Sequence, residues 1–583
     1  MTTGQTFGPL TASDGTTFRL WAPGANTARL VLDEPIPMER RGEWFSVFVK
    51  GAGAGTRYRF EIDGELRIAD PASRYQPMDV AGPSEVIDHR YSWSCTDWRG
   101  RPWHEAVFYE LHTGTFTPEG TFRAAIDKLD HLAAAGITAI ELMPLADFPG
   151  RWNWGYDGVL WFAPDSRYGR PDDLKALIDA AHQCGLMVFL DVVYNHFGPE
   201  GNYLGRIAPQ FFCDKHTPWG GAIDYRVAEV RRFAVENAVA WLRDYRFDGL
   251  RLDAVHAIVE PGNPHILEEI SSGVGQLARE TGRHIHLVLE NDDNCARWLA
   301  PGEDPPNGHY RAQWNDDFHH AFHVQLTGEK HGYYKDYRES PRHAARTLAE
   351  GFAYQGEPSP NREGKPRGEP SRQLPPLAFV NFLQNHDQIG NRPFGERLSE
   401  LAPRRALETA LGVLLLTPSP PLLFMGEEWG SRAPFAFFCD FQGELADAVR
   451  NGRKKEFAEI YAASGDRIPD PLAEDTFRHA KLDWDETSNA GAPRLTFVSR
   501  LLAARRDHIV PILASLIGAR ANASFTGGLL NARWESDTQA YTLIANFSDQ
   551  PLQSKWPRWE TRVWGTPEKD LPAWSICAGI GPL

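Results

Sequence analysis

Short apolar segments alternate with longer amphipathic segments between about residues 105 and 485, and this alternation limits the fold more than any other feature of the sequence. VFYELH (107–112) and LMVFLDVVYNH (186–196) are two of the strand-like segments. The segment 227–245 has apolar residues three and four positions apart, which is the spacing of one helix face. Repeated strand–helix units predict a parallel β-sheet with helices packed against it.

A parallel sheet of this length is either doubly wound or closed into a (β/α)8 barrel. No GxGxxG motif opens a helix after the first strand, which argues against a dinucleotide-binding, doubly wound sheet. Polar residues gather where the strands are expected to end, and a barrel brings such residues together on one face. We therefore predict a (β/α)8 barrel whose site includes His112, 191–196, Asp253, Glu290 and 385–387.

Both ends of the chain have a different pattern. Residues 1–90 contain short alternating segments bounded by turn residues, which predicts an N-terminal β-sandwich. The barrel is expected over 105–485, and strand-like runs return over 486–583, which predicts a C-terminal β domain. The Pro- and Gly-rich segment 355–376 is expected to be a long surface loop between two barrel strands.

Composition narrows the class of partner. The net charge of −16 repels phosphate backbones and anionic lipid, so we expect neither nucleic acid nor a membrane as a partner. The six cysteines include no CxxC pair, and no secretory leader or membrane-length apolar run is visible, so we expect a cytoplasmic protein. Aromatic residues make up 12% of the chain, which suits sugar binding but is equally compatible with an aromatic core.

Two opposite charges interrupt the apolar strand in RFDGLRLDAVHAI (246–258). Side chains two apart on a strand point the same way, so Arg251 and Asp253 should both face the mouth of the barrel. A neighbouring guanidinium lowers the pKa of a carboxyl group and keeps it ionised, as nucleophilic attack requires. The alternative is a structural ion pair that caps the barrel.

Two further acids follow two later strands. Glu290 ends an apolar run, where burial raises the pKa of a carboxyl group toward the value that a general acid needs. The alternative is a carboxylate bonded to backbone at a strand end. Asp387 follows a third strand, next to His386, whose imidazole can donate to a hydroxyl. Two carboxyl groups on either side of one bond are the minimum for glycoside hydrolysis, so we expect no cofactor and no catalytic metal.

Other polar and aromatic residues are expected around the same face. Asp191 can pair with Arg251, and His196 can reach a sugar hydroxyl, although a lone histidine is more often a packing residue. Trp152, Trp154 and Tyr156 can form a stacking wall for sugar rings or a hydrophobic plug under their loop.

Four stretches now identify a family resemblance. DVVYNH, GLRLDAVH, LVLEND and FLQNHDQ, in this order, resemble the four signatures of the α-amylase superfamily, glycoside hydrolase family 13. The resemblance implies a (β/α)8 barrel and retention of the α configuration, with Asp253 as nucleophile, Glu290 as general acid/base and Asp387 as transition-state stabiliser. It also implies that Arg251, His196, His386 and Tyr156 surround the sugar at the cleavage point. Some members bind Ca²⁺ through a long insert after the third strand, but 196–224 is short here, so no metal site is expected.

Further stretches narrow the resemblance within the superfamily. YELHTGTFTPEGTF, HFGPEGNYL, ENDDN and QWNDDFHH resemble members that release trehalose. The implied partners are maltooligosyl trehalose and α-glucan oligosaccharides, and we expect Asp292, Asn315 and Asp316 to help recognise the trehalose end. The rivals are a glycogen branching or debranching enzyme, which shares every catalytic residue, and a non-catalytic barrel used for binding.

Overall fold

The computed structural model describes residues 5–217, 219–300, 307–456, 458, 467–566 and 569–583. Eight parallel strands close into the predicted barrel, and each strand is buried along its length. In barrel order they are β10 (Phe108–Leu111), β11 (Ala139–Leu142), β14 (Met187–Val192), β17 (Gly249–Leu252), β18 (His286–Leu289), β19 (Ala312–Trp314), β22 (Phe379–Phe382) and β23 (Pro421–Phe424).

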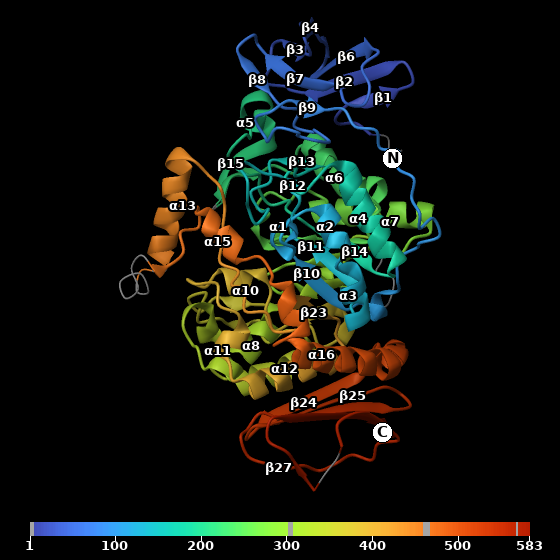
Figure 1. The fold of residues 1–583 in the computed structure, drawn as a ribbon, viewed down its shortest axis with the longest axis vertical. Helices are drawn as coiled ribbons and strands as arrows, with labels where there is room; N and C mark the ends of the chain where they lie inside the picture. Colours follow the sequence, from blue (N-terminus) through green and yellow to red (C-terminus); the bar gives the residue numbers. More distant parts are fainter. Residues whose placement is uncertain (1–4, 218, 301–306, 457, 459–466, 567–568) are drawn as a thin grey trace.

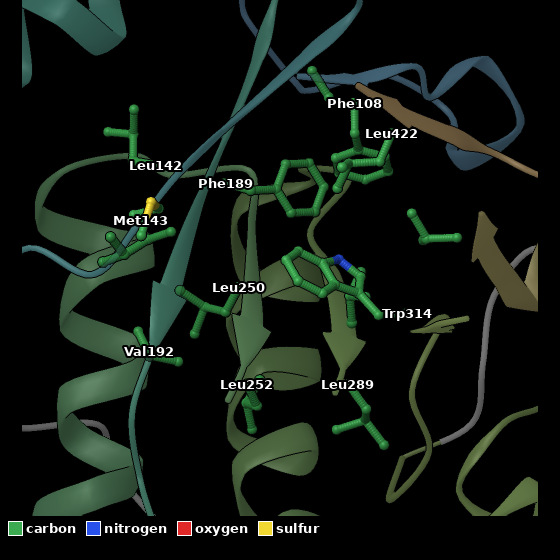
Figure 2. Close-up of a cluster of buried hydrophobic side chains, with 14 of the residues drawn as sticks. Phe108, Leu142, Met143, Phe189, Val192, Leu250, Leu252, Leu289, Trp314 and Leu422 are labelled. Carbon is green, nitrogen blue, oxygen red and sulfur yellow. The ribbon is translucent and has the colours of Figure 1, made fainter. Parts of the chain in front are cut away.

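Helices surround this barrel, as the alternating pattern predicts. They include α2 (Phe122–Ile126), α3 (Leu129–Ala135), α4 (Pro171–Gln183), α6 (Ala228–Asp244), α7 (Ile266–Thr281), α8 (Asp316–Thr327), α9 (Ser340–Glu350), α12 (Arg404–Leu416) and α16 (Ala492–Ala504). The barrel interior is filled rather than open, because the rings of Phe108 and Phe189 meet edge to face at 4.9 Å and Trp314 lies close to them (Figure 2).

The N-terminal segment is a β-sandwich that lies at one end of the elongated molecule (Figure 1). Its inner faces meet where the rings of Phe18 and Tyr58 lie 4.7 Å apart. One sheet contains β1 (Leu10–Ala12), β2 (Gly15–Trp21), β6 (Trp44–Lys50) and β5 (Glu39–Arg41); the other contains β4 (Pro35–Pro37), β3 (Ala28–Val31), β7 (Arg57–Ile62) and β8 (Leu66–Ile68), with β9 (Ser84–Glu85) beside β7.

The opposite end of the molecule is a five-stranded antiparallel sheet (Figure 1). Its strands, in spatial order, are β24 (Arg520–Thr526), β25 (Leu529–Glu535), β26 (Ala540–Asn546), β30 (Ser575–Gly581) and β28 (Thr561–Trp564). Helix α16 precedes this sheet and packs against α3 and α12 of the barrel. The domain limits 1–90, 105–485 and 486–583 stay a prediction.

Four short strand pairs and several short helices lie in the connections. The segment predicted as a loop over 355–376 contains the hairpin β20 (Glu357–Pro358) and β21 (Pro366–Arg367). The other pairs are β12 (Ala146–Asp147) with β13 (Leu160–Pro164), β15 (Phe212–Thr217) with β16 (Gly220–Ile223), and β27 (Leu552–Gln553) with β29 (Asp570–Leu571). The short helices include α1 (Thr113–Phe116), α5 (Leu204–Ile207), α10 (His386–Gly390), α11 (Leu398–Leu401) and α15 (Glu474–His479), and the longer helix α13 (Gly443–Glu456) lies between α12 and α15.

Candidate active site

Arg251 is the electrostatic centre of the site. Its side chain is fully buried on β17, and its Nη1 donates to Asp191 Oδ2 at 2.6 Å and to Asp253 Oδ1 at 2.9 Å. Its Nη2 lies 2.9 Å from Glu290 Oε2. Strands β14 and β17 pair with Asp191 directly beside Arg251, which explains the first contact. One guanidinium therefore brings together acids from the ends of three neighbouring strands.

The segment after β17 turns sharply. It contains Asp253 and donates a backbone hydrogen bond to Glu290. Ala254 has a left-handed backbone (φ +39°), which is strained for a residue with a side chain. In this conformation its amide donates to Glu290 Oε2 at 2.7 Å. Asn195 donates to Asp253 Oδ2 at 2.9 Å. The two carboxyl groups are thus held by separate donors as well as by their common guanidinium.

The environment of Glu290 favours the protonated acid. Burial raises the pKa of Glu290, and the charge of Arg251 opposes that rise without cancelling it. The side chains of Asp253 and Glu290 are 13% and 17% exposed, so a ligand can reach both. A carboxyl group with a raised pKa is suited to proton donation near neutral pH.

Asp387 lies on the first turn of helix α10, next to His386. His386 Nε2 is 3.4 Å from Asp387 Oδ1, and its Nδ1 is 2.5 Å from Glu110 Oε1 on β10. Burial alone would lower the pKa of His386, but Asp387 and Glu110 raise it to about 9. The imidazole is therefore charged at neutral pH and can donate at the site.

Tyr156 joins these groups from the loop after β12. Its hydroxyl donates to Asp191 Oδ2 at 2.6 Å, and its ring stacks on His386 with the centroids 5.1 Å apart. Burial raises the pKa of Asp191 to about 7, against the charge of Arg251. His196 Nε2 lies 2.9 Å from the carbonyl oxygen of Tyr156, so the structure places His196 beside the same cluster.

Two of the residues expected at the trehalose end are acids on this face. The side chain of Asp292 is 52% exposed and forms ion pairs with Arg362 and Arg367. Asp316 is half-buried, and burial together with the charges of Glu290, Asp292 and Asp387 raises its pKa well above the usual range. This shift favours the protonated form of Asp316, which can donate a hydrogen bond.

Three other candidates are almost fully buried. Trp152 is 5% exposed and stacks on Phe477, and Trp154 is 4% exposed and stacks on Phe435. Asn315 is 1% exposed, and its amide nitrogen donates to the carbonyl of Gly351 and the side chain of Asn381. Their burial favours the hydrophobic plug for the two tryptophans and a role within the protein for the amide.

The sequence reasoning missed residues whose importance depends on the folded chain. Trp219 is 45% exposed and stacks on His196 with centroids 4.8 Å apart, and it belongs to the hairpin of β15 and β16. Asn195 was noted only as part of the cluster 191–196, and Glu110 only as part of a strand. Alternation along β10 was a usable signal, because Glu110 lies two residues before His112.

Among the described residues, no group of three or more His, Cys, Asp or Glu side chains is arranged to hold a metal ion. Within the same ranges, no helix is both long and apolar enough to cross a bilayer.

Comparison with known proteins decides the family. Residues 91–219 match the α-amylase catalytic domain, and residues 6–74 match carbohydrate-binding module 48, the isoamylase N-terminal domain. The malto-oligosyltrehalose trehalohydrolase of Deinococcus radiodurans is 44% identical over 505 residues, which cover 86% of this chain and 82% of that protein. The enzyme of the same name from Rhizobium sp. is 42% identical, over 92% of this chain and 91% of that protein.

This chain belongs to the malto-oligosyltrehalose trehalohydrolase family. As a member it is a glycoside hydrolase. A 1,4-alpha-glucan branching enzyme from Leifsonia xyli is more distant, at 35% identity over 72% of this chain and 60% of that protein.

Solved structures share this fold. A structure titled putative alpha amylase from Salmonella typhimurium has a TM-score of 0.94 and 45% identity, and it covers 99% of this chain and 100% of that one. A type I pullulanase from Bacillus subtilis has a TM-score of 0.70 at 18% identity, over 100% of this chain and 86% of that one, which shows a shared fold.

Proposed function

We propose that this enzyme hydrolyses the α-1,4 bond next to the terminal trehalose of maltooligosyl trehalose. The products are trehalose and a maltooligosaccharide with one end freed. The proposal is supported by the membership of the trehalohydrolase family over most of the chain. The coarser statement, that the substrates are α-glucans, has the additional support of the catalytic-domain and carbohydrate-binding-module matches.

We assign the catalytic roles to Asp253, Glu290 and Asp387. The Glu290 carboxyl group donates its proton to the leaving oxygen while the Asp253 carboxylate attacks the anomeric carbon, and the bond to trehalose breaks. Water then attacks the glycosyl-enzyme, and Glu290 takes back a proton as base, which restores both carboxyl groups. The single observation that supports this assignment most is the contact of Arg251 with both Asp253 and Glu290. It keeps the nucleophile beside a cation, while burial raises the pKa of the acid.

Asp387 and His386 are assigned to the sugar at the cleavage point. Asp387 is 37% exposed, and the charged imidazole beside it is 2% exposed. We assign Asp387 to stabilising the positive charge that develops on the sugar ring in the transition state. Tyr156, with its ring stacked on His386, closes one side of the same sugar site.

The substrate is tested by offering maltooligosyl trehalose and a linear maltooligosaccharide with the same number of glucose units. We expect trehalose as the main product from the first substrate and a much lower kcat/KM on the second. Transfer of chains to a branch point, or equal cleavage of both substrates, would show that the enzyme has the activity of the rival branching or debranching class.

The roles of the acids are tested with α-maltosyl fluoride, because fluoride leaves without a proton from the enzyme. Glu290→Gln should lower kcat on maltooligosyl trehalose by about 10²- to 10⁴-fold and still release a burst of fluoride equal to the enzyme concentration. Asp253→Asn should release no burst, since no covalent intermediate can form. The reverse pattern would exchange the two assignments.

A further inference from the structure

The segment between β19 and β22 is attached to the end of β18. Its hairpin of β20 and β21 places two arginines, Arg362 and Arg367, against the residues that follow Glu290. A third link forms where the amide of Glu369 donates to the carbonyl of Asn294 at 3.0 Å. Ion pairs of Arg362 with Asp292 and Asp293, and of Arg367 with Asp292, therefore join this segment to one short stretch of the active-site face.

Arg367 makes the most extensive of these contacts, and its side chain is only 4% exposed. Its Nε donates to the carbonyl oxygen of Asp292 at 2.8 Å, and its Nη2 donates to Asp292 Oδ1 at 3.0 Å. Its Nη1 donates to Asp317 Oδ1 at 2.9 Å and to the Tyr337 hydroxyl at 2.6 Å. A planar guanidinium is required for this pattern, because a lysine ammonium cannot point in all of these directions.

Asp317 anchors the other side of this arginine. It is fully buried at the start of α8, where it also accepts from the amides of Ala353 and Tyr354 and from the side chain of Asn294. Asn294 lies in the same stretch as Asp292. Asp317 thus fixes the position of the Arg367 guanidinium, and the guanidinium in turn fixes the position of Asp292.

Asp292 lies close in the sequence to Glu290 and is hydrogen-bonded to the segment that follows Asp253. It lies two residues after Glu290, and its amide donates to Nδ1 of His256, three residues after Asp253. Burial would raise the pKa of Asp292, but Arg367 and Arg362 lower it to about 2, so its half-exposed carboxylate is ionised on the active-site face.

We infer that Arg367 is a positioning residue for the cleavage step: it holds the stretch from Glu290 to Asn294 in the geometry in which Glu290 donates its proton and Asp292 meets the sugar. The inference rests on the proposed function. Arg367 itself is almost fully buried, so we expect it to act through Asp292 rather than by contact with the substrate. A small shift of a catalytic group is enough to lower a rate strongly, which makes such a residue visible in kinetics.

A purely structural role is the alternative, in which Arg367 only neutralises the buried Asp317. That role predicts a less stable enzyme and a smaller fraction of active molecules, but the same kcat for each active molecule. A positioning role predicts that kcat for each active molecule falls. Counting active sites by the fluoride burst, measured with Glu290→Gln added to each variant so that the glycosyl-enzyme accumulates, separates the two.

The experiment compares Arg367→Met, Arg367→Lys and Asp292→Asn in the full-length enzyme on maltooligosyl trehalose. We expect Arg367→Met to lower kcat by about 10- to 100-fold after correction for active sites, and Arg367→Lys to lower it less. The effect of adding Arg367→Met to Asp292→Asn should be much smaller than its effect on the wild type, because both act through the same contact. If Arg367→Met does not fold, the same comparison is made with Arg367→Lys.

Arg372→Met is the matched control. Arg372 belongs to the same segment, but its side chain is 67% exposed and its ion pair with Glu350 spans 3.8 Å, so we expect no change in kcat. An unchanged kcat in both Arg367 variants, or additive effects of the substitutions at 367 and 292, would overturn the inference. The proposed function is judged separately, by whether the wild type releases trehalose. If the wild type instead cleaves the linear maltooligosaccharide, the Arg367 variants are compared on that substrate, where the positioning role predicts the same fall in kcat.

Discussion

At the scale of single residues, one cation of the site contacts several acids. Arg251 contacts Asp191, Asp253 and Glu290. Its guanidinium carbon Cζ lies over the ring of Trp314, 4.1 Å from the ring centroid. Each contact lowers the cost of keeping an acid charged in a buried place, and burial acts in the opposite direction. For Asp191 and Glu290 burial outweighs the cation, and the pKa of each is raised.

The pair of Glu110 and His386 gives a prediction at this scale. The folded pKa of His386, about 9, is above its ordinary value of 6.5, so the charged imidazole adds stability that is complete below pH 6.5 and is lost as the pH rises through 9. Glu110→Gln removes one of the two charges that raise this pKa. We expect the pKa of His386 to fall, and the unfolding free energy at pH 7 to fall by about 1 to 3 kcal/mol. Histidine NMR titration and urea unfolding at several pH values measure both.

Glu141→Gln is the control for this substitution. Glu141 is a buried glutamate on the neighbouring strand β11, and burial raises its pKa well above the usual range, which favours its neutral form. Replacing it by the neutral amide should leave the His386 titration close to that of the wild type. A fall as large as that of Glu110→Gln would mean that the effect is one of packing rather than charge.

At the scale of elements, strand β17, which carries Arg251, begins at a glycine for a steric reason. A Cβ at Gly249 would lie 2.1 Å from the ring of Phe189 on β14 and 2.5 Å from the carbonyl oxygen of His286 on β18. Gly249→Ala should therefore cost about 1 to 3 kcal/mol of unfolding free energy. It should also lower kcat, because Arg251 is two residues further along the strand. Urea unfolding and initial rates test both effects.

Gly452→Ala is the control, because a Cβ at this glycine meets no clash. Gly452 lies within α13, and a Cβ there would meet no atom within 4 Å. Gly452→Ala should stabilise the helix by about 0.5 to 1 kcal/mol and leave kcat unchanged. Equal effects of the two substitutions would contradict the steric explanation for β17.

At the scale of the whole molecule, the N-terminal sandwich is attached to the barrel through Glu236 of α6. The Glu236 carboxylate accepts hydrogen bonds from the backbone amides of Thr6 at 2.8 Å and Phe7 at 3.1 Å. Arg74 Nη2 of the sandwich lies 3.7 Å from Glu236 Oε1. Glu236→Gln should weaken this attachment by about 1 to 3 kcal/mol. We expect faster amide exchange in β1 and β2, with kcat unchanged, because the proposed catalytic groups all belong to the barrel.

Glu229→Gln is the control on the same helix. Glu229 lies 3.8 Å from Arg232 of its own helix, so its loss should not alter exchange in the sandwich. Similar exchange in the two variants would show that Glu236 does not hold the sandwich in place.

The sequence alone determined the closed barrel, the two flanking β regions and the family, because strand and helix periodicity and the catalytic motifs are local properties of the chain. Alternation along β17 was also enough to pair Arg251 with Asp253. The sequence was not enough to show that Trp152, Trp154 and Asn315 are buried, since burial depends on which distant segments cover a residue.

Only the tertiary structure decided which residues support the catalytic strand ends from outside the motifs. Glu110 is 276 residues from His386, and Arg367 is 75 residues from Asp292, so no local pattern joins either pair. The sequence predicts a loop over 355–376 because Pro and Gly residues disfavour long helices and strands. Its ion pairs form only once closure of the barrel brings the ends of β18 and β19 together, where buried charges require partners.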